Sequence, residues 1–214
     1  METILKKKKE EACFLDRLPP LILASRSPRR RELLSRLTEN FRAVPSSFDE
    51  TPLMTAGLPP EKLVLALSEG KALSVRGEPD TPPDAVVIGG DTVVVPPSGG
   101  IFGIPRDRAD AERMLRELSG RIHRVVTGIT LAGPAGIRRF SVTTEVVFYP
   151  LSPAEISWYL DTGEPFDKAG AYGIQGKGAL LVREVRGDYC NVVGLPLAEL
   201  ARKLSEFCGF LSNS

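Results

Sequence analysis

Histidine and cysteine, which supply most transition-metal ligands and all disulfides, are scarce in this sequence. It contains one histidine, His123, and three cysteines, Cys13, Cys190 and Cys208, which lie far apart and form no Cys-x-x-Cys pair. This excludes a site with several imidazole ligands. It also argues against a thiolate zinc site and a disulfide framework, and fits a reducing cytoplasm. If a metal takes part, we expect oxygen ligands and a hard cation such as Mg²⁺ or Mn²⁺.

Long apolar runs and a large net charge are also absent. No segment is apolar over the length that spans a bilayer, and no apolar stretch of signal-peptide length follows the lysines at 6–9. The formal net charge is +1, so no overall field attracts nucleic acid or a membrane surface. We therefore expect a cytoplasmic protein that binds neither. Residues 1–18 carry mixed charges, and we expect them to form a solvated, flexible leader.

Three familiar sequence signatures are missing. There is no Gly-x-x-x-x-Gly-Lys-Ser/Thr loop and no Gly-x-Gly-x-x-Gly after a strand, so the P-loop and dinucleotide-binding classes lose support. With one histidine and no Gly-x-Ser-x-Gly, a Ser-His-Asp hydrolase is also poorly supported. Any phosphate binding must come from a local cluster of cations.

The apolar pattern predicts strands that alternate with helices. Strands are expected at 21–24, 41–44, 85–88 with a continuation at 93–95, 124–131, 140–148 and 179–185, and helices at 28–37, 60–75, 107–119, 152–160 and 196–207. Because hairpins are mixed with the alternating elements, we expect an α/β fold with a mixed sheet. The length suits a single domain, which we place at residues 19–210.

The first candidate site lies where the strand at 21–24 ends and a helix begins. Ser27 suits the N-cap and Pro28 the first helical position, so the free N–H groups and the dipole of this turn favour an anion. Three arginines follow at 29–31, where the same dipole disfavours cations. Such a violation is expected where function overrides stability. We interpret the segment 25–31 as a phosphate site; an ordinary helix start with solvated arginines is the alternative.

Asp91 is the second candidate. It stands between apolar Ile88 and Val93, after two glycines that let the backbone bend and a ligand come close. A carboxylate beside so apolar a strand is partly desolvated and needs a proton, a cation or a metal. Asp91 is therefore a candidate general base, or a ligand for a phosphate-bound divalent ion. A Gly-Gly-Asp-Thr turn between two strands is the alternative.

The third candidate is the glycine-rich segment 164–176. Five glycines between 170 and 187 indicate a loop whose backbone approaches another group closely. Gln175 carries a donor and an acceptor and suits the edge of a nucleobase, whereas Lys168 suits a phosphate and Asp167 a metal. A glycine-rich turn with an exposed Asp-Lys pair is the alternative. Four other charged residues, each better explained singly as solvated or in a structural ion pair, are weaker candidates: Asp49, Glu50, Lys71 and Glu145.

In this order, the sites resemble the Maf family of nucleoside triphosphate pyrophosphatases. The resemblance runs from about Leu21 to Leu204. Five matches in register carry it: Leu23–Leu34, Lys71-Ala72, Gly90–Val94, Leu118–Gly128, and Asp167–Gly176 continuing to Gly187–Tyr189 and Asn191–Leu197.

The resemblance implies a fold and an activity. The fold is a two-lobed mixed α/β fold with a twisted sheet, similar to that of the inosine triphosphate pyrophosphatases, with the nucleotide in the central cleft. The activity is house-cleaning hydrolysis of a nucleoside triphosphate to its monophosphate and pyrophosphate, with a divalent metal and commonly as a homodimer. The unbroken Ala-Tyr-Gly-Ile-Gln-Gly run resembles the branch that acts on dTTP and UTP. The 7-methyl-GTP branch is the alternative.

The resemblance also implies roles for single residues. Asp91 matches the family's catalytic acid, which is taken as the proton acceptor. Arg29, Thr92 and Gln175 match positions linked to substrate choice. With the reasoning above, we expect a metal to be bound by Asp91 with Glu50, and the substrate by Ser25, Ser27, Arg29, Arg30, Lys71, Thr92, Lys168 and Gln175.

One departure from the family pattern bears on activity. The usual Gly-Lys-Pro is here Gly-Ile-Pro, with Ile104 in the place of the lysine, so a cation expected near the triphosphate is missing. Arg106 or Arg108 are candidates to supply it. The departure favours a rival interpretation, a regulator of cell division that binds a nucleotide with little turnover. An RNA-binding role for the lysines at 6–9 gains little from a net charge of +1.

Overall fold

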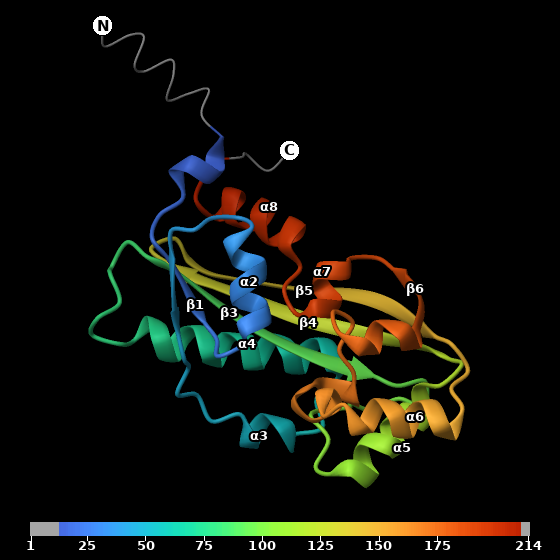
Figure 1. Ribbon diagram of the computed structural model, residues 1–214. Helices are drawn as coiled ribbons and strands as arrows, with labels where there is room; N and C mark the ends of the chain where they lie inside the picture. Colours follow the sequence, from blue (N-terminus) through green and yellow to red (C-terminus); the bar gives the residue numbers. More distant parts are fainter. Residues whose placement is uncertain (1–12, 211–214) are drawn as a thin grey trace, which may run out of the picture.

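The computed structural model describes residues 13–210. The prediction of a flexible leader therefore lies outside the described residues for positions 1–12, which include the lysines at 6–9. Phe14–Arg17 form a short 3-10 helix, η1, near the C-terminal end of the described chain (Figure 1). The Arg17 guanidinium lies 4.8 Å from the centre of the Phe210 ring, which ties this segment to the residues that follow the last helix.

A six-stranded mixed sheet forms the centre of the molecule, in the order β2-β1-β3-β4-β5-β6. Parallel pairing joins β1 to β2 and β3, and all other pairs are antiparallel. The strands are β1 (Leu21–Ala24), β2 (Phe41–Val44), β3 (Val86–Val95), β4 (Ile122–Gly133), β5 (Gly136–Phe148) and β6 (Val182–Arg186). The predicted mixed α/β fold is confirmed.

Helices cover both faces of the sheet (Figure 1). α2 (Pro28–Ser35) and α8 (Leu197–Phe207) lie on one face, and α4 (Pro60–Arg76) lies on the other. Leu21 and Leu23 pack into the core of the first face, whereas Ile22 and Ala24 pack under α4. All four strand residues are buried, as the short apolar run predicted.

A second lobe gathers at the far end of the long strands. It contains α5 (Arg108–Leu118), α6 (Pro153–Asp161) and three 3-10 turns, η2 (Glu164–Asp167), η3 (Ala169–Ala171) and η4 (Lys177–Leu181). The predicted strand start at 179 is wrong, because the η4 turn occupies that position and β6 begins at Val182. Two short helices, α3 (Thr51–Met54) and α7 (Tyr189–Val193), were not predicted.

The unequal lengths of β1 and β3 open the space between the lobes. β1 ends at Ala24, level with Gly89, while β3 continues to Val95 alongside β4. Asp91 therefore lies inside one continuous strand, and the alternative of a Gly-Gly-Asp-Thr turn is wrong. Residues 90–93 pair with β4 on one side, and no strand within 13–210 pairs with them on the other.

Two glycines let α4 approach the sheet at this point. A Cβ on Gly128 would lie 2.5 Å from the Val64 carbonyl carbon, and one on Gly89 would overlap the Ser68 carbonyl oxygen. A residue with a side chain at either position would push the helix away. This close packing sets the position of Lys71, one turn further along α4.

Candidate active site

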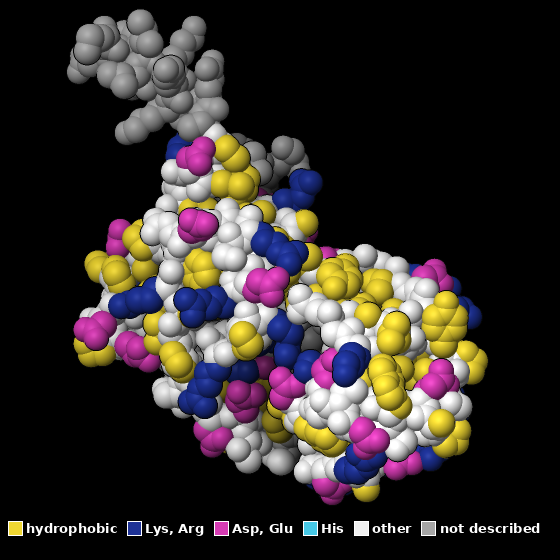
Figure 2. Space-filling view, in the orientation of Figure 1, with side chains coloured by type: hydrophobic (Ala, Val, Ile, Leu, Met, Phe, Trp, Pro, Cys, Tyr) yellow, Lys and Arg dark blue, Asp and Glu magenta, His cyan; other side chains and the backbone are white. Residues whose placement is uncertain are grey.

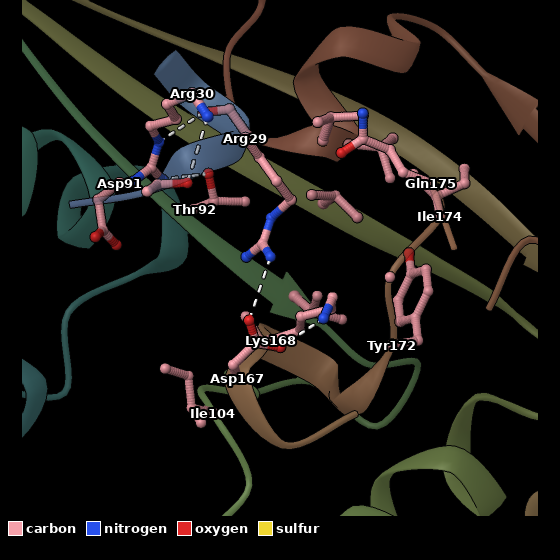
Figure 3. A pocket seen from close by; sticks show the side chains of 18 of the residues that line it. Arg29, Arg30, Asp91, Thr92, Ile104, Asp167, Lys168, Tyr172, Ile174 and Gln175 are labelled. Carbon is pink, nitrogen blue, oxygen red and sulfur yellow. Dashed lines mark hydrogen bonds and ion pairs between the residues drawn. The ribbon is translucent and has the colours of Figure 1, made fainter. Parts of the chain in front are cut away.

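A cleft of about 580 Å³ lies between the two lobes (Figure 3). Its walls come from α2, α4, β3, the 3-10 turns and α7. It is lined by all but one of the predicted site residues: Ser27, Arg29, Arg30, Glu50, Lys71, Asp91, Thr92, Lys168 and Gln175. The exception, Ser25, lines an adjoining pocket of about 330 Å³ that shares Ser27, Arg30, Glu50 and Lys71 with the cleft. In the space-filling view, lysine, arginine and acidic side chains gather around the hollow between the lobes (Figure 2).

Two carboxylates share one ammonium group at the α4 side of the cleft. Lys71 Nζ lies 2.5 Å from Asp91 Oδ1 and 2.9 Å from Glu50 Oε1. Side chains alternate along a strand, so the Asp91 side chain lies on the same face of β3 as the contact between Gly89 and α4. The Asp91 and Lys71 side chains are only 12% and 14% exposed, whereas that of Glu50 is 44% exposed. The fold thus unites Asp91 with two residues that were only weak candidates singly.

Arg30 is fixed on the opposite face of β3. Its Nε donates to Gly194 O at 2.8 Å, and its Nη2 donates to Thr92 Oγ1 at 2.9 Å. Thr92 in turn bonds Thr127 Oγ1 at 2.9 Å, and the Thr127 hydroxyl donates to Asn191 O at 3.1 Å. Burial lowers the pKa of Arg30, and the charge of Asp91 opposes that effect. An arginine stays protonated in proteins, so this side chain supplies a rigid positive charge.

A carboxylate links two further cations across the mouth of the cleft. Arg29 Nη1 lies 3.4 Å from Asp167 Oδ2, and Lys168 Nζ lies 2.5 Å from Asp167 Oδ1 (Figure 3). Burial raises the pKa of Asp167, but the hydrogen bond and charge of Lys168 and the charge of Arg29 outweigh it and lower the pKa overall. The Asp167 side chain is 67% exposed and that of Lys168 only 16%, so the alternative of an exposed pair is wrong for the lysine.

The remaining wall is formed by the glycine-rich segment. Tyr172, Ile174 and Gln175 line the cleft there, with Gln175 exposed (Figure 3). The Tyr172 hydroxyl lies 2.8 Å from His123 Nε2. Both rings are buried, and burial lowers the pKa of His123 to about 4 and raises the pKa of Tyr172. His123 is therefore neutral near pH 7 and supports the wall without reaching the cleft.

Ile104 also lines the cleft and is 61% exposed. Neither predicted substitute for the missing lysine lines it. Arg106 Nε lies 3.3 Å from Asp110 Oδ2, and Arg108 Nη2 lies 2.8 Å from Asp161 Oδ1. Both arginines take part in surface ion pairs instead.

Two weaker candidates lie outside the cleft. The Asp49 carboxylate accepts a hydrogen bond from the Thr51 backbone N–H at 3.0 Å, and Glu145 lies 3.8 Å from Arg186 Nη1. Sequence reasoning missed Tyr159 and gave Glu164 no role beyond its place in the segment 164–176; both side chains support the glycine-rich segment. The only signal for them was the density of glycines in the segment they contact.

The carboxylates of the cleft fit a hard divalent ion. No group of three or more His, Cys, Asp or Glu side chains suited to a metal occurs within residues 13–210. Mg²⁺, however, is usually bound by one or two carboxylates together with substrate phosphates and waters. Asp91 and Glu50, which contact the same ammonium group, offer such a pair of oxygen donors.

Comparisons with known proteins agree with this site. The family model described as Maf-like protein matches residues 20–207. A dTTP/UTP pyrophosphatase of Bacillus velezensis is 50% identical over 187 residues, which cover 87% of this chain and 96% of the relative. One from Anaeromyxobacter dehalogenans is 50% identical over 190 residues, covering 87% and 93%.

Among solved structures, the Staphylococcus aureus Ham1 protein has a TM-score of 0.50 at 16% identity and covers 87% of this chain and 98% of its own. At that identity the likeness concerns the fold alone. No helix among the described residues is long and apolar enough to cross a membrane. The family match spans almost the whole chain, and with relatives at 50% identity it establishes that this chain belongs to the Maf family.

Proposed function

We propose that this chain is a pyrophosphatase that hydrolyses dTTP and UTP to the monophosphate and pyrophosphate, in a house-cleaning role. The observation that carries the proposal is the Asp91 carboxylate, held by Lys71 in a cleft that cations line on both sides. The names of the curated relatives support the substrates. The cleft volume, about 580 Å³, lies within the range usual for small-molecule sites.

The cations divide the work of binding the triphosphate. Arg30 is fixed by Gly194 and Thr92 and gives a preorganised contact for one phosphate. Arg29 and Lys168 reach in from opposite lobes, and both are paired with the largely exposed Asp167 carboxylate, which phosphate oxygens can replace. Preorganised positive charge of this kind stabilises the charge that builds up as the phosphoanhydride breaks.

Asp91 activates the attacking water. Its free oxygen accepts a proton from a water in line with the departing pyrophosphate, while Lys71 holds the other oxygen. A Mg²⁺ or Mn²⁺ ion bound by Asp91 and Glu50 would supply charge neutralisation at the phosphates. Ser25 and Ser27 offer hydroxyls at the α2 end of the cleft and the adjoining pocket.

A pyrophosphate-release assay tests the proposal. The purified chain is incubated with Mg²⁺ or Mn²⁺ and with dTTP, UTP, CTP, 7-methyl-GTP or ATP. Release from dTTP and UTP above the others is expected, and a preference for 7-methyl-GTP would move the chain to the other branch. The exposed Ile104 in the cleft favours one rival, a nucleotide-binding regulator, and saturable binding without pyrophosphate release would support that rival.

Two further expectations stand beside the activity. We propose a homodimer from the family resemblance, which light scattering after gel filtration tests. We also propose a cytoplasmic location, because the three cysteines are all free. No nucleic-acid or membrane partner is proposed.

A further inference from the structure

The segment that carries Gln175 is held at both ends by two neighbouring side chains. The Tyr159 hydroxyl accepts a hydrogen bond from Gly173 N at 2.9 Å and donates one to Glu164 Oε1 at 2.9 Å. Glu164 Oε2 accepts from Lys177 N at 2.8 Å, and Oε1 accepts from Gly178 N at 3.2 Å. One connected pair therefore fixes the backbone on either side of Gln175.

The glycines of the segment make these contacts possible. A Cβ on Gly176 would lie 2.6 Å from the Glu164 Cδ, and one on Gly178 would lie 2.7 Å from the Tyr159 hydroxyl oxygen. A Cβ on Gly173 would lie 3.0 Å from Glu164 Oε1. The close backbone approach that Gly176 and Gly178 predict is thus an approach to this pair, whereas Gly173 approaches both Glu164 and the Lys168 side chain, whose Cε would lie 2.5 Å from its Cβ.

Burial makes the pair suited to hold a fixed geometry. Tyr159 is fully buried, and burial raises its pKa, so the hydroxyl remains a donor at physiological pH. Both Glu164 oxygens are used by the hydroxyl and the two backbone N–H groups. Although Glu164 borders the cleft, its carboxylate is occupied in supporting the segment. Hydrogen bonds to a charged acceptor are among the stronger ones in proteins.

We propose that Tyr159 and Glu164 are positioning residues for base selection: they hold residues 173–178 so that the Gln175 amide meets the edge of a pyrimidine. The inference rests on the proposed function. It adds that selectivity depends on two residues that support the segment as well as on the side chain that faces the base.

The main test is Tyr159→Phe, which removes the hydroxyl and keeps the buried ring. We expect the KM for dTTP to rise about tenfold and the selectivity for dTTP over CTP to fall about tenfold, the effect of one hydrogen bond to a charged group. The kcat should change less than about threefold, because the contact holds the base in ground and transition states alike. Inhibition by pyrophosphate should not change, because the cations are untouched. Tyr149→Phe, at a tyrosine that is 49% exposed, is the matched control.

A second variant covers the case in which Tyr159→Phe folds poorly. Glu164→Gln keeps the shape but sets an amide group against a backbone N–H, and the same loss of selectivity is expected. Its control is Glu184→Gln, on the surface beside Arg186. Adding Tyr159→Phe to Gln175→Ala should cost no further selectivity, since both changes act on one contact.

Specific outcomes would overturn the inference. An unchanged dTTP to CTP ratio in a folded Tyr159→Phe variant would do so, as would equal losses in dTTP and pyrophosphate binding. Failure of the proposed function can be distinguished from failure of this inference. If the wild-type chain releases no pyrophosphate, calorimetric binding of dTTP and CTP to the same variants still decides whether the pair controls base selection.

Discussion

Replacement of Asp91 by Asn tests the reaction centre most directly. The change keeps the shape of the side chain and removes its ability to accept a proton. Loss of a positioned general base lowers turnover by about 10²–10⁴-fold. The lower part of this range applies if Glu50, which contacts the same Lys71 ammonium, activates water in its place.

The structure indicates that this loss will not come from unfolding. Lys71 also pairs with Glu50 at 2.9 Å, and because the substitution leaves Glu50 in place, the ammonium is not left unpaired beside the strand. Removing the charge also relieves the desolvation of a side chain that is only 12% exposed. We expect the free energy of unfolding to change by about 1 kcal/mol or less, which corresponds to about 2–4 °C in Tm for a domain of this size.

The assay combines single-turnover pyrophosphate release with binding of a triphosphate that has a methylene bridge between the α- and β-phosphates. The Asp91→Asn variant should bind this analogue within about tenfold of the wild type, because Arg29, Arg30 and Lys168 are intact. Asp84→Asn, at an exposed position before β3, is the control. Near-normal turnover by the Asp91→Asn variant would refute the role of Asp91 as the base.

Three further predictions follow from the packing and charge of the cleft. Gly128→Ala places a Cβ 2.5 Å from the Val64 carbonyl carbon. It should lower the free energy of unfolding by about 1–3 kcal/mol and lower kcat by moving Lys71. Gly77→Ala, where a Cβ would make ordinary contacts, is the control and should do neither. Ile104→Lys should lower the KM for triphosphates up to about tenfold in a salt-dependent manner, and an equal effect of Ile104→Met would contradict the electrostatic reason. Burial lowers the pKa of His123 from 6.5 to about 4 in the folded chain. As pH falls, the imidazole is therefore protonated first in the unfolded chain. The stability present above pH 6.5 is lost toward pH 4, and the loss amounts to about 2 kcal/mol at pH 5. His123→Asn should flatten that dependence in urea titrations at pH 7 and pH 5.

Local patterns predicted most of the elements that position the site. β1, β2, α2, α4 and α5 were predicted within one or two residues. The signals differ: β1 is a short apolar run, α2 has a recognisable start at Ser27 before Pro28, and α4 and α5 carry apolar residues on one face. The short helices α3 and α7 have too few residues to show a period. The strand at 179–185 was extended too far back because Leu180 and Leu181 are apolar. Only the fold shows that Leu181 is buried while Leu180 is 69% exposed in a 3-10 turn.

The site shows a different limit. Asp91, Arg30 and Gln175 stand in unusual local surroundings, and those surroundings identified them. Lys71 and Glu50 look like ordinary charges on a helix and in a loop, and their importance comes from a third element that brings both to Asp91. Pairings between residues so far apart in the sequence carry no local signal. The family resemblance pointed to Lys71, whereas Glu50 was a candidate only as a charged residue in a loop.

The charges that line the cleft indicate how Ile104, in the place of the family's lysine, affects the need for the proposed metal. Four cations line it, Arg29, Arg30, Lys71 and Lys168, and so do four carboxylates, Glu50, Asp91, Glu164 and Asp167, which leaves the lining neutral. A lysine at position 104 would raise the net charge of the lining to +1. A neutral cleft attracts a triphosphate polyanion less strongly, and substrate phosphates must replace Asp167 at Arg29 and Lys168. The chain should therefore depend more on a divalent ion brought with the nucleotide, and Ile104→Lys should lower the Mg²⁺ or Mn²⁺ concentration needed for half-maximal turnover. An unchanged metal requirement would mean that the charge at 104 does not act on the phosphates.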